Sequence, residues 1–272
     1  MATGDLIAVR PWTPPLARLR RVVRVVAREL GPVARIGLPA LLRHPVWTSA
    51  AAEGNGLGVV VVPGFGGVDR DLAVLRRWLE RRGYRPAGAG LGMNLGCTAE
   101  LVGRLERRIE EHARATGGPV IVLGHSRGGM LGRLVAVGRP DLVRGLVMLG
   151  SPVLDPLDVR GVATRVCQLL LRLSAVGVRG LLNRDCLTGS CGETAAAGLA
   201  APLLMPALAI YSQDDGVVGW QSCRDPAAEW VEVRSSHTGM GIDPELYVQL
   251  APRLAGWAAR RPDEQADGER TS

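Results

Sequence analysis

The feature that most constrains the fold is the stretch over residues 120–130, Val-Ile-Val-Leu-Gly-His-Ser-Arg-Gly-Gly-Met. Its apolar, β-branched start predicts a buried strand, and the residues that follow are compatible with a helix. Gly124 and Gly128 flank Ser126 in a Gly-x-Ser-x-Gly pattern, typical of a sharp strand–turn–helix junction that strains the serine backbone. The pattern indicates a nucleophilic serine, with the Arg127 N–H directed at a developing negative charge. A glycine-rich turn without a chemical role is the alternative.

Strand-like apolar runs alternate with amphipathic helical segments along most of the chain. We expect strands at residues 57–62, 84–91, 119–123, 143–149, 207–212 and 230–234, and helices at 69–82, 98–116, 127–137 and about 244–261. This alternation predicts an α/β fold with a mostly parallel sheet flanked by helices. Residues 153–201 break the rhythm with an apolar helix at 162–176 and a loop-like stretch at 183–193. We interpret them as an insertion over the carboxyl edge of the sheet, where ligands bind in such folds.

Positive charge is concentrated at the N-terminus. The first 50 residues hold eight arginines against two acidic residues, a net of +6, whereas the remaining 222 hold 25 arginines against 24 acidic residues, a net of +1. A nearly neutral body argues against a nucleic-acid partner. Apolar residues recur at helical spacing from Leu16 to Leu30 with arginines between them, which predicts a basic amphipathic helix. Packing on the body is the favoured interpretation, and peripheral contact with an anionic membrane surface is the second.

The length of the chain fits one domain with two extensions. We expect a basic, amphipathic helical segment over residues 1–50, an α/β domain over residues 51–261 and a flexible polar tail over residues 262–272. No apolar run reaches the ~18 residues of a membrane span, and no uninterrupted apolar core of a secretory signal is present. We therefore expect a cytoplasmic protein, and peripheral association with a membrane is the alternative.

Five cysteines, at positions 97, 167, 186, 191 and 223, make an odd count without the spacing of zinc ligands. We therefore expect no metal site and no cofactor. Cys186 and Cys191 are close enough in sequence to form a disulfide, but the sequence does not require one.

A serine hydroxyl is a weak nucleophile, so it needs a base, and that base needs an orienting carboxylate. Candidates for both follow Ser126, each just beyond a predicted strand. Asp215 is followed by Gly-Val-Val, and its neighbour Asp214 is the alternative acid. His237 alone among the four histidines lies in a loop after the last predicted strand. We predict Ser126 as nucleophile, His237 as general base and Asp215 as the partner of that base.

The first predicted strand runs directly into Pro-Gly-Phe-Gly-Gly, residues 63–67. In Gly-x-Ser-x-Gly enzymes a loop in this position supplies the second backbone donor of the oxyanion hole. We predict the N–H groups of Phe65 and Arg127 as the two donors, because a backbone donor does not depend on the neighbouring side chain. A glycine-rich turn that only passes close to the next helix is the alternative.

These motifs resemble the α/β-hydrolase superfamily, and within it the lidded bacterial lipase-like and esterase-like members. The resemblance runs from about residue 57 to residue 257 and rests on segments 63–67, 92–96, 124–129, 141–152, 211–218 and 236–239. It implies an α/β-hydrolase fold with a helical lid insertion at 153–201. It also implies a serine hydrolase that cleaves carboxylic esters through an acyl-enzyme. Arg127 departs from the pattern, since such lipases more often carry an apolar residue there.

The expected substrate is a small-molecule or lipid ester, and the apolar insertion favours a hydrophobic acyl group. Two other functions stay open. An acyltransferase or thioesterase would use the same three residues, because an alcohol acceptor differs from water only in the shape of the site. A non-catalytic, membrane-associated binding protein would keep the fold without the chemistry. The presence of all three residue types in the expected order favours an enzyme.

Overall fold

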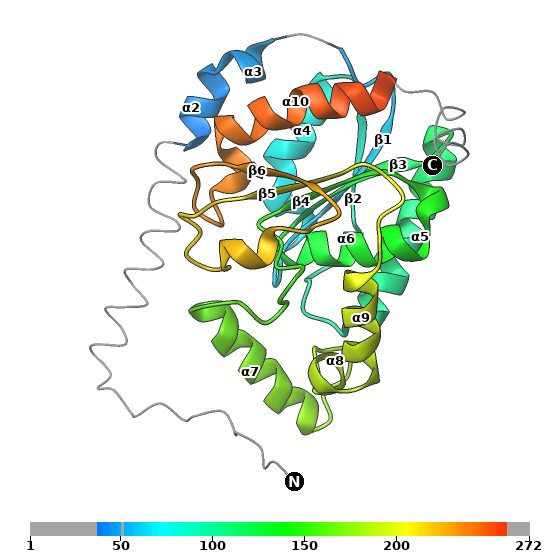
Figure 1. Ribbon diagram of the computed structural model, residues 1–272, viewed down its shortest axis with the longest axis vertical. Coiled ribbons are helices and arrows are strands. Elements are labelled where there is room, and N and C mark those ends of the chain that lie inside the picture. Colours follow the sequence, from blue (N-terminus) through cyan, green and yellow to red (C-terminus); the bar gives the residue numbers. More distant parts are fainter. Residues whose placement is uncertain (1–36, 50–51, 260–272) are drawn as a thin grey trace.

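Six parallel strands form one sheet in the order β2–β1–β3–β4–β5–β6, in a computed structural model that describes residues 37–49 and 52–259 (Figure 1). The strands are β1 (Gly58–Val62), β2 (Arg85–Gly88), β3 (Val120–His125), β4 (Val143–Leu149), β5 (Ala207–Tyr211) and β6 (Glu229–Glu232). Strands β1 and β4 are buried along their whole length, which is why they read as continuous apolar runs. The predicted parallel sheet is confirmed.

Helices cover both faces of the sheet. They are α2 (Leu38–Arg43), α3 (Pro45–Thr48), α4 (Ala73–Arg81), α5 (Thr98–Thr116), α6 (Arg127–Gly138), α7 (Val162–Ala175), α8 (Asp185–Thr188), α9 (Ser190–Ala200) and α10 (Pro244–Ala259). Alternate side chains of β3 point to opposite faces. Val120 and Val122 join a core with α5 and α6, whereas Ile121 and Leu123 join a core with α4 and α10. Two apolar layers therefore hold the sheet from either side.

Part of the predicted N-terminal segment packs on this domain. Leu41 on α2 is fully buried in the core shared by α4 and α10. The indole of Trp78 donates a hydrogen bond of 2.9 Å to the carbonyl of Val46, and Trp47 packs edge-on against Tyr247. Helices α2 and α3 thus belong to the packed body. The predicted basic helix at 16–30 and the tail at 262–272 lie outside the described residues.

The insertion, residues 153–201, connects β4 to β5 and carries α7, α8 and α9. Figure 1 shows α7 and α8 on the side of the sheet away from α10. The prediction of a loop at 183–193 is wrong, because α8 and the start of α9 lie within these residues. The amide oxygen of Asn183 accepts the backbone N–H of Cys186, a local side-chain cap. Helices this short leave no periodic apolar pattern in the sequence.

A buried ion pair fixes the end of the insertion. Arg133 on α6 donates to Asp225 at 2.5 Å, and both side chains are almost fully buried. The same guanidinium donates to the carbonyls of Gly198 and Ala201 at 2.8 and 2.9 Å. Arg133 therefore ties the end of α9 to the body of the domain.

In the described ranges 37–49 and 52–259, no helix has the length and apolarity needed to cross a membrane.

Candidate active site

Ser126 occupies the turn between β3 and α6 in a backbone conformation rarely adopted by a residue with a side chain. Its φ is 54° and its ψ is −127°, a strained combination that costs about 1–3 kcal/mol. The Ser126 N–H donates to the carbonyl of Leu149 at 2.7 Å, which ties the turn to the end of β4. A Cβ at Gly128 would lie 2.3 Å from the carbonyl oxygen of Val62, so only glycine fits there. The predicted strained serine turn is confirmed.

The predicted base and acid are in contact. His237 Nδ1 lies 2.6 Å from Asp215 Oδ2, and both side chains are buried. The other carboxylate oxygen of Asp215 accepts the backbone N–H groups of Val217 and Val218, each at 2.8 Å. Because a carboxylate oxygen accepts, Nδ1 is the donor in this contact and Nε2 is the ring nitrogen left for another partner. The alternative acid, Asp214, is exposed.

The pair lies beside the serine turn. Gly150 directly follows Leu149, the residue that accepts the Ser126 N–H. A Cβ at Gly150 would lie 3.3 Å from both Asp215 Oδ2 and His237 Nδ1, so its backbone passes close to the pair. The Asp215–His237 pair therefore lies next to the end of β4, to which the turn of Ser126 is also tied. The roles of Ser126, His237 and Asp215 as nucleophile, base and acid stay predictions.

His125, to which the sequence assigned no role, contacts the loop of His237. Its Nε2 lies 3.0 Å from the carbonyl oxygen of His237, and the two imidazole centroids are 4.6 Å apart. Burial, reinforced by the neighbouring His237, lowers the pKa of His125 to about 3, so its ring is neutral at pH 7. A carbonyl only accepts, so the Nε2 of His125 carries its proton. The sequence signal for this residue was only its position next to Ser126.

The loop after β1 holds the first predicted oxyanion donor. Asn94 braces it, since the Gly66 N–H donates to the Asn94 carbonyl at 2.9 Å and the Asn94 N–H donates to the Gly67 carbonyl at 3.0 Å. Within residues 37–49 and 52–259, no hydrogen bond uses the N–H of Phe65 or that of Arg127. That these two N–H groups form an oxyanion hole stays a prediction.

The side chain of Arg127 is buried and binds the chain that leads into α5. Its guanidinium donates to the carbonyl of Gly96 at 2.8 Å and to the hydroxyl of Thr98 at 3.2 Å. It also lies over the ring of Phe65, 5.6 Å from the centroid. Burial lowers the pKa of the guanidinium from its usual value. Arg127, the residue that departs from the expected pattern, thus braces the loop after β1 through Phe65 and the neighbouring segment through Gly96 and Thr98.

Three cysteines meet outside this site. In the part of the chain that the structure describes, Cys97, Cys186 and Cys191 are the one group of His, Cys, Asp or Glu side chains with a geometry that could hold a metal ion. All five cysteines are free thiols, so the disulfide considered for Cys186 and Cys191 is not formed. The spacing in the sequence gave no indication of this cluster, because Cys97 and Cys186 are 89 positions apart.

About three quarters of the chain is similar in fold to solved structures of lipolytic enzymes. A soluble variant of monoglyceride lipase from Saccharomyces cerevisiae has a TM-score of 0.53 at 15% identity, covering 78% of this chain and 88% of that chain. The metagenome-derived lipolytic enzymes LipS and LipT give a TM-score of 0.53 at 19% identity, covering 76% of this chain and 95% of that chain. A monoacylglycerol lipase from Paleococcus ferrophilus gives 0.52 at 17% identity, covering 74% of this chain and 93% of that chain.

No family model and no curated protein matches the chain. At the low identities of the structural matches, similarity speaks for the fold alone. The parallel sheet, the helices on both of its faces and the serine turn after β3 agree with these matches. The chain therefore has the α/β-hydrolase fold.

Proposed function

We propose that this protein is a serine hydrolase that cleaves carboxylic esters. One observation carries the proposal: His237 and Asp215 are 2.6 Å apart next to Gly150, directly after Leu149, whose carbonyl accepts the N–H of Ser126 in its strained turn. Nucleophile, base and orienting acid are the parts that such a reaction requires. The backbone donors of Phe65 and Arg127 supply the remaining part, an oxyanion hole.

In the proposed reaction, Ser126 Oγ attacks the carbonyl carbon of the ester as His237 Nε2 takes the hydroxyl proton. The carbonyl oxygen becomes an oxyanion, and the N–H groups of Phe65 and Arg127 stabilise it. The imidazolium, held by Asp215, returns the proton to the departing alkoxide and leaves an acyl-enzyme. Water then attacks the carbonyl carbon of the acyl-enzyme while His237 takes its proton. The proton returns to Ser126 Oγ as the carboxylic acid leaves. No step needs a metal or cofactor.

The proposed substrate is a small-molecule or lipid ester with a hydrophobic acyl group. The ring of Phe65, in the proposed oxyanion loop, packs with Val166 and Leu170 of α7 in one apolar cluster. The same helix leaves Leu169 and Leu173 partly exposed, at 53% and 37% of their surface. An apolar helix beside the oxyanion loop gives an acyl chain a surface that excludes water.

Covalent labelling and turnover test the proposal. A fluorophosphonate probe should label the wild-type protein on Ser126 and leave Ser126→Ala unlabelled. Turnover of a soluble ester should fall in that variant by about 10⁴–10⁶-fold. Ser190→Ala is the matched control, since Ser190 is an exposed serine on α9 and should keep full activity. More than a tenth of wild-type turnover in Ser126→Ala would rule out this nucleophile.

A substrate panel distinguishes the related reactions. Esters of graded acyl length, the matching thioesters and an added alcohol acceptor should be compared under the same conditions. We expect kcat/KM to rise with acyl length, because each buried methylene contributes about 0.8 kcal/mol. Faster cleavage of thioesters, or transfer to the alcohol in preference to water, would assign the same residues to a thioesterase or an acyltransferase.

A further inference from the structure

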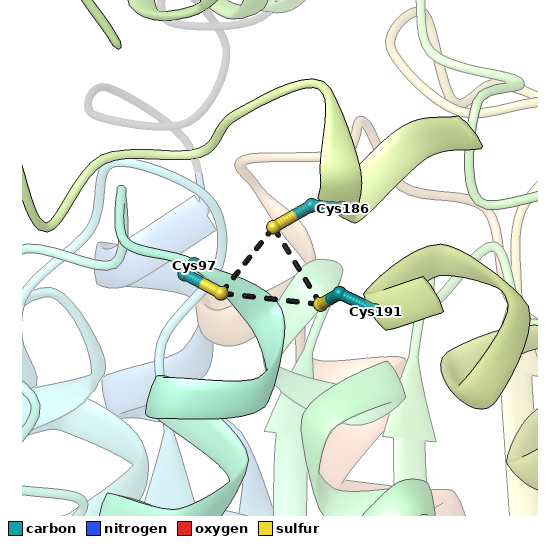
Figure 2. A group of neighbouring side chains, drawn as sticks. All are labelled: Cys97, Cys186 and Cys191. Atoms are coloured by element: carbon teal, nitrogen blue, oxygen red, sulfur yellow. Dashed lines mark hydrogen bonds between the residues drawn. The ribbon is translucent and has the colours of Figure 1, made fainter. Parts of the chain in front are cut away.

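Three thiols from three separate segments point at one another (Figure 2). Cys97 directly precedes α5, whereas Cys186 lies on α8 and Cys191 on α9 of the insertion. The Sγ–Sγ distances are 3.4 Å for Cys97 and Cys186, 3.7 Å for Cys186 and Cys191, and 3.9 Å for Cys97 and Cys191. The sulfurs thus form a nearly equilateral triangle, in which no pair is markedly closer than the others.

This triangle fits the dimensions of a thiolate zinc site. Zinc binds thiolate sulfur at about 2.3 Å with tetrahedral angles, which places its sulfur ligands about 3.8 Å apart. The three sulfurs are already near that separation, at 3.4–3.9 Å. A disulfide requires an S–S bond of about 2.0 Å and uses two sulfurs only. It would draw one pair together and leave the third thiol without a partner.

The surroundings of the triangle also suit three thiolates. Cys186 is buried and the other two are half-buried, against Leu170 and Leu182 in one apolar cluster. The Thr98 N–H donates to Cys186 Sγ at 3.5 Å, the kind of hydrogen bond that supports a ligating thiolate.

The charge of the site is balanced as well. The guanidinium of Arg127 interacts electrostatically with Cys186, Cys97 and Cys191, and also with the neighbouring Cys167. One zinc ion with three thiolates carries a net charge of −1, and Arg127 offsets that charge at a buried position where an uncompensated charge would be costly.

We propose that Cys97, Cys186 and Cys191 bind one Zn²⁺ ion through their three sulfurs, with a water molecule at the fourth position. Binding converts three thiols to thiolates and releases three protons to solvent, with no change in oxidation state. This differs from the expectation of no metal, which rested on spacing in the sequence. The assignment stands independently of the proposed hydrolase activity, since none of the three cysteines belongs to the proposed triad.

The site would fasten the insertion to the segment that braces the oxyanion loop. Cys97 follows directly on Gly96, whose carbonyl accepts from Arg127. The Leu182 N–H donates to the Leu95 carbonyl at 2.8 Å, so the chain leading into α8 already touches this segment. Because the metal would bind both the segment at Cys97 and the helices α8 and α9, separating them would also require breaking metal–thiolate bonds. Removal of the metal should therefore loosen α8 and α9 before it affects the sheet.

Metal binding by the full-length protein tests the proposal. The protein is purified with a reductant and without chelators, and bound zinc is measured by mass spectrometry of the metal. We expect roughly one equivalent per chain in the wild type. Substitution with Co²⁺ should give the intense sulfur-to-metal charge-transfer absorption of a thiolate site.

Cysteine variants identify the ligands. Cys97→Ser, Cys186→Ser and Cys191→Ser should each lower zinc affinity by more than the roughly 10–100-fold that loss of an outer-shell partner costs. Cys167→Ser is the matched control, because Cys167 lies in the same apolar cluster but outside the triangle. A zinc-free wild type, or zinc retained in the three triangle variants, would overturn the proposal.

Alkylation of the wild type keeps the test decisive if a serine variant fails to fold. Zinc should slow the alkylation of the three triangle cysteines by at least about tenfold and leave that of Cys167 unchanged. Limited proteolysis should likewise cut the insertion faster after zinc is removed by a chelator. Equal alkylation with and without zinc, or a disulfide within the triangle together with no zinc binding after reduction, would contradict the assignment.

Discussion

His125 and His237 face each other with the Nε2 of the first 3.0 Å from the backbone carbonyl oxygen of the second. The Nε2–H group of the neutral His125 ring donates a hydrogen bond to that carbonyl. This bond holds the backbone of His237, from which its imidazole extends. The 2.6 Å contact between Nδ1 of His237 and the carboxylate of Asp215 holds the imidazole itself. We infer that His125 is a positioning residue, which acts through His237 and does not itself take up a proton near neutral pH.

The titration of His125 gives the first prediction. Its pKa is about 3 in the folded protein, below the usual value of 6.5 that applies after unfolding. Between these values the unfolded state binds one more proton, so this residue lowers the unfolding free energy as the pH falls, by about 1.4 kcal/mol per pH unit. In His125→Gln that contribution is absent, and urea titrations between pH 6.5 and 5 should show a correspondingly weaker loss of stability. Above pH 7 the unfolding free energies of the wild type and the variant should change with pH in the same way. If the two curves of unfolding free energy against pH are parallel at every pH, the prediction is refuted.

The two neighbouring carboxylates give the second prediction. Asp215→Asn should lower kcat by about 10⁴-fold, because an amide cannot hold the imidazole of His237 in its productive tautomer. Asp214→Asn is the matched control, because Asp214 is exposed one position away and should keep most activity. Initial rates on a soluble ester, with the unfolding transition of each variant recorded alongside, measure both. The reverse ranking of the two variants would show that the acid has been misassigned.

Close packing at the serine turn gives the third prediction. A methyl group at Gly128 would lie 2.3 Å from the carbonyl oxygen of Val62, so Gly128→Ala should destabilise the protein by about 1–3 kcal/mol. Gly138, at the end of the same helix, has open space around it. Gly138→Ala should therefore be neutral or stabilise by up to about 1 kcal/mol. Urea denaturation of the pair measures both effects, and equal stabilities would contradict the tight approach of α6 to β1.

The N-terminal charge gives the fourth prediction. Residues 1–36 hold seven arginines against two acidic residues, a net of +5. Basic residues near an anionic membrane contribute about 1 kcal/mol each, and salt screens them. The full-length protein should therefore co-sediment with anionic vesicles at low salt. A variant lacking residues 1–36 should not, yet it should keep ester hydrolysis, because the deletion spares α2 with its buried Leu41.

Two controls separate the outcomes of that deletion. Vesicles of zwitterionic lipid alone should bind neither protein, since the expected attraction is electrostatic. Absence of anionic-vesicle binding by the full-length chain would support packing of the N-terminal segment on the body, the interpretation that the sequence favoured.

Local sequence patterns by themselves determined the sheet and the larger helices. Each strand begins within one residue of its predicted start, and α5 has the predicted bounds. Apolar runs and amphipathic periodicity are properties of neighbouring residues, so the sequence contains them directly. The serine turn is equally local, because the glycines that permit its backbone lie within two residues of Ser126.

Contacts between distant segments were decided only by the tertiary structure. Asp214 and Asp215 are adjacent in sequence, and only the path of the chain after β5 turns one carboxylate toward His237. The role of His125 depends on a contact across 112 positions, and the cysteine triangle spans 94. The sequence contains no local trace of such contacts, because they depend on how the insertion and the last loop fold back over the sheet.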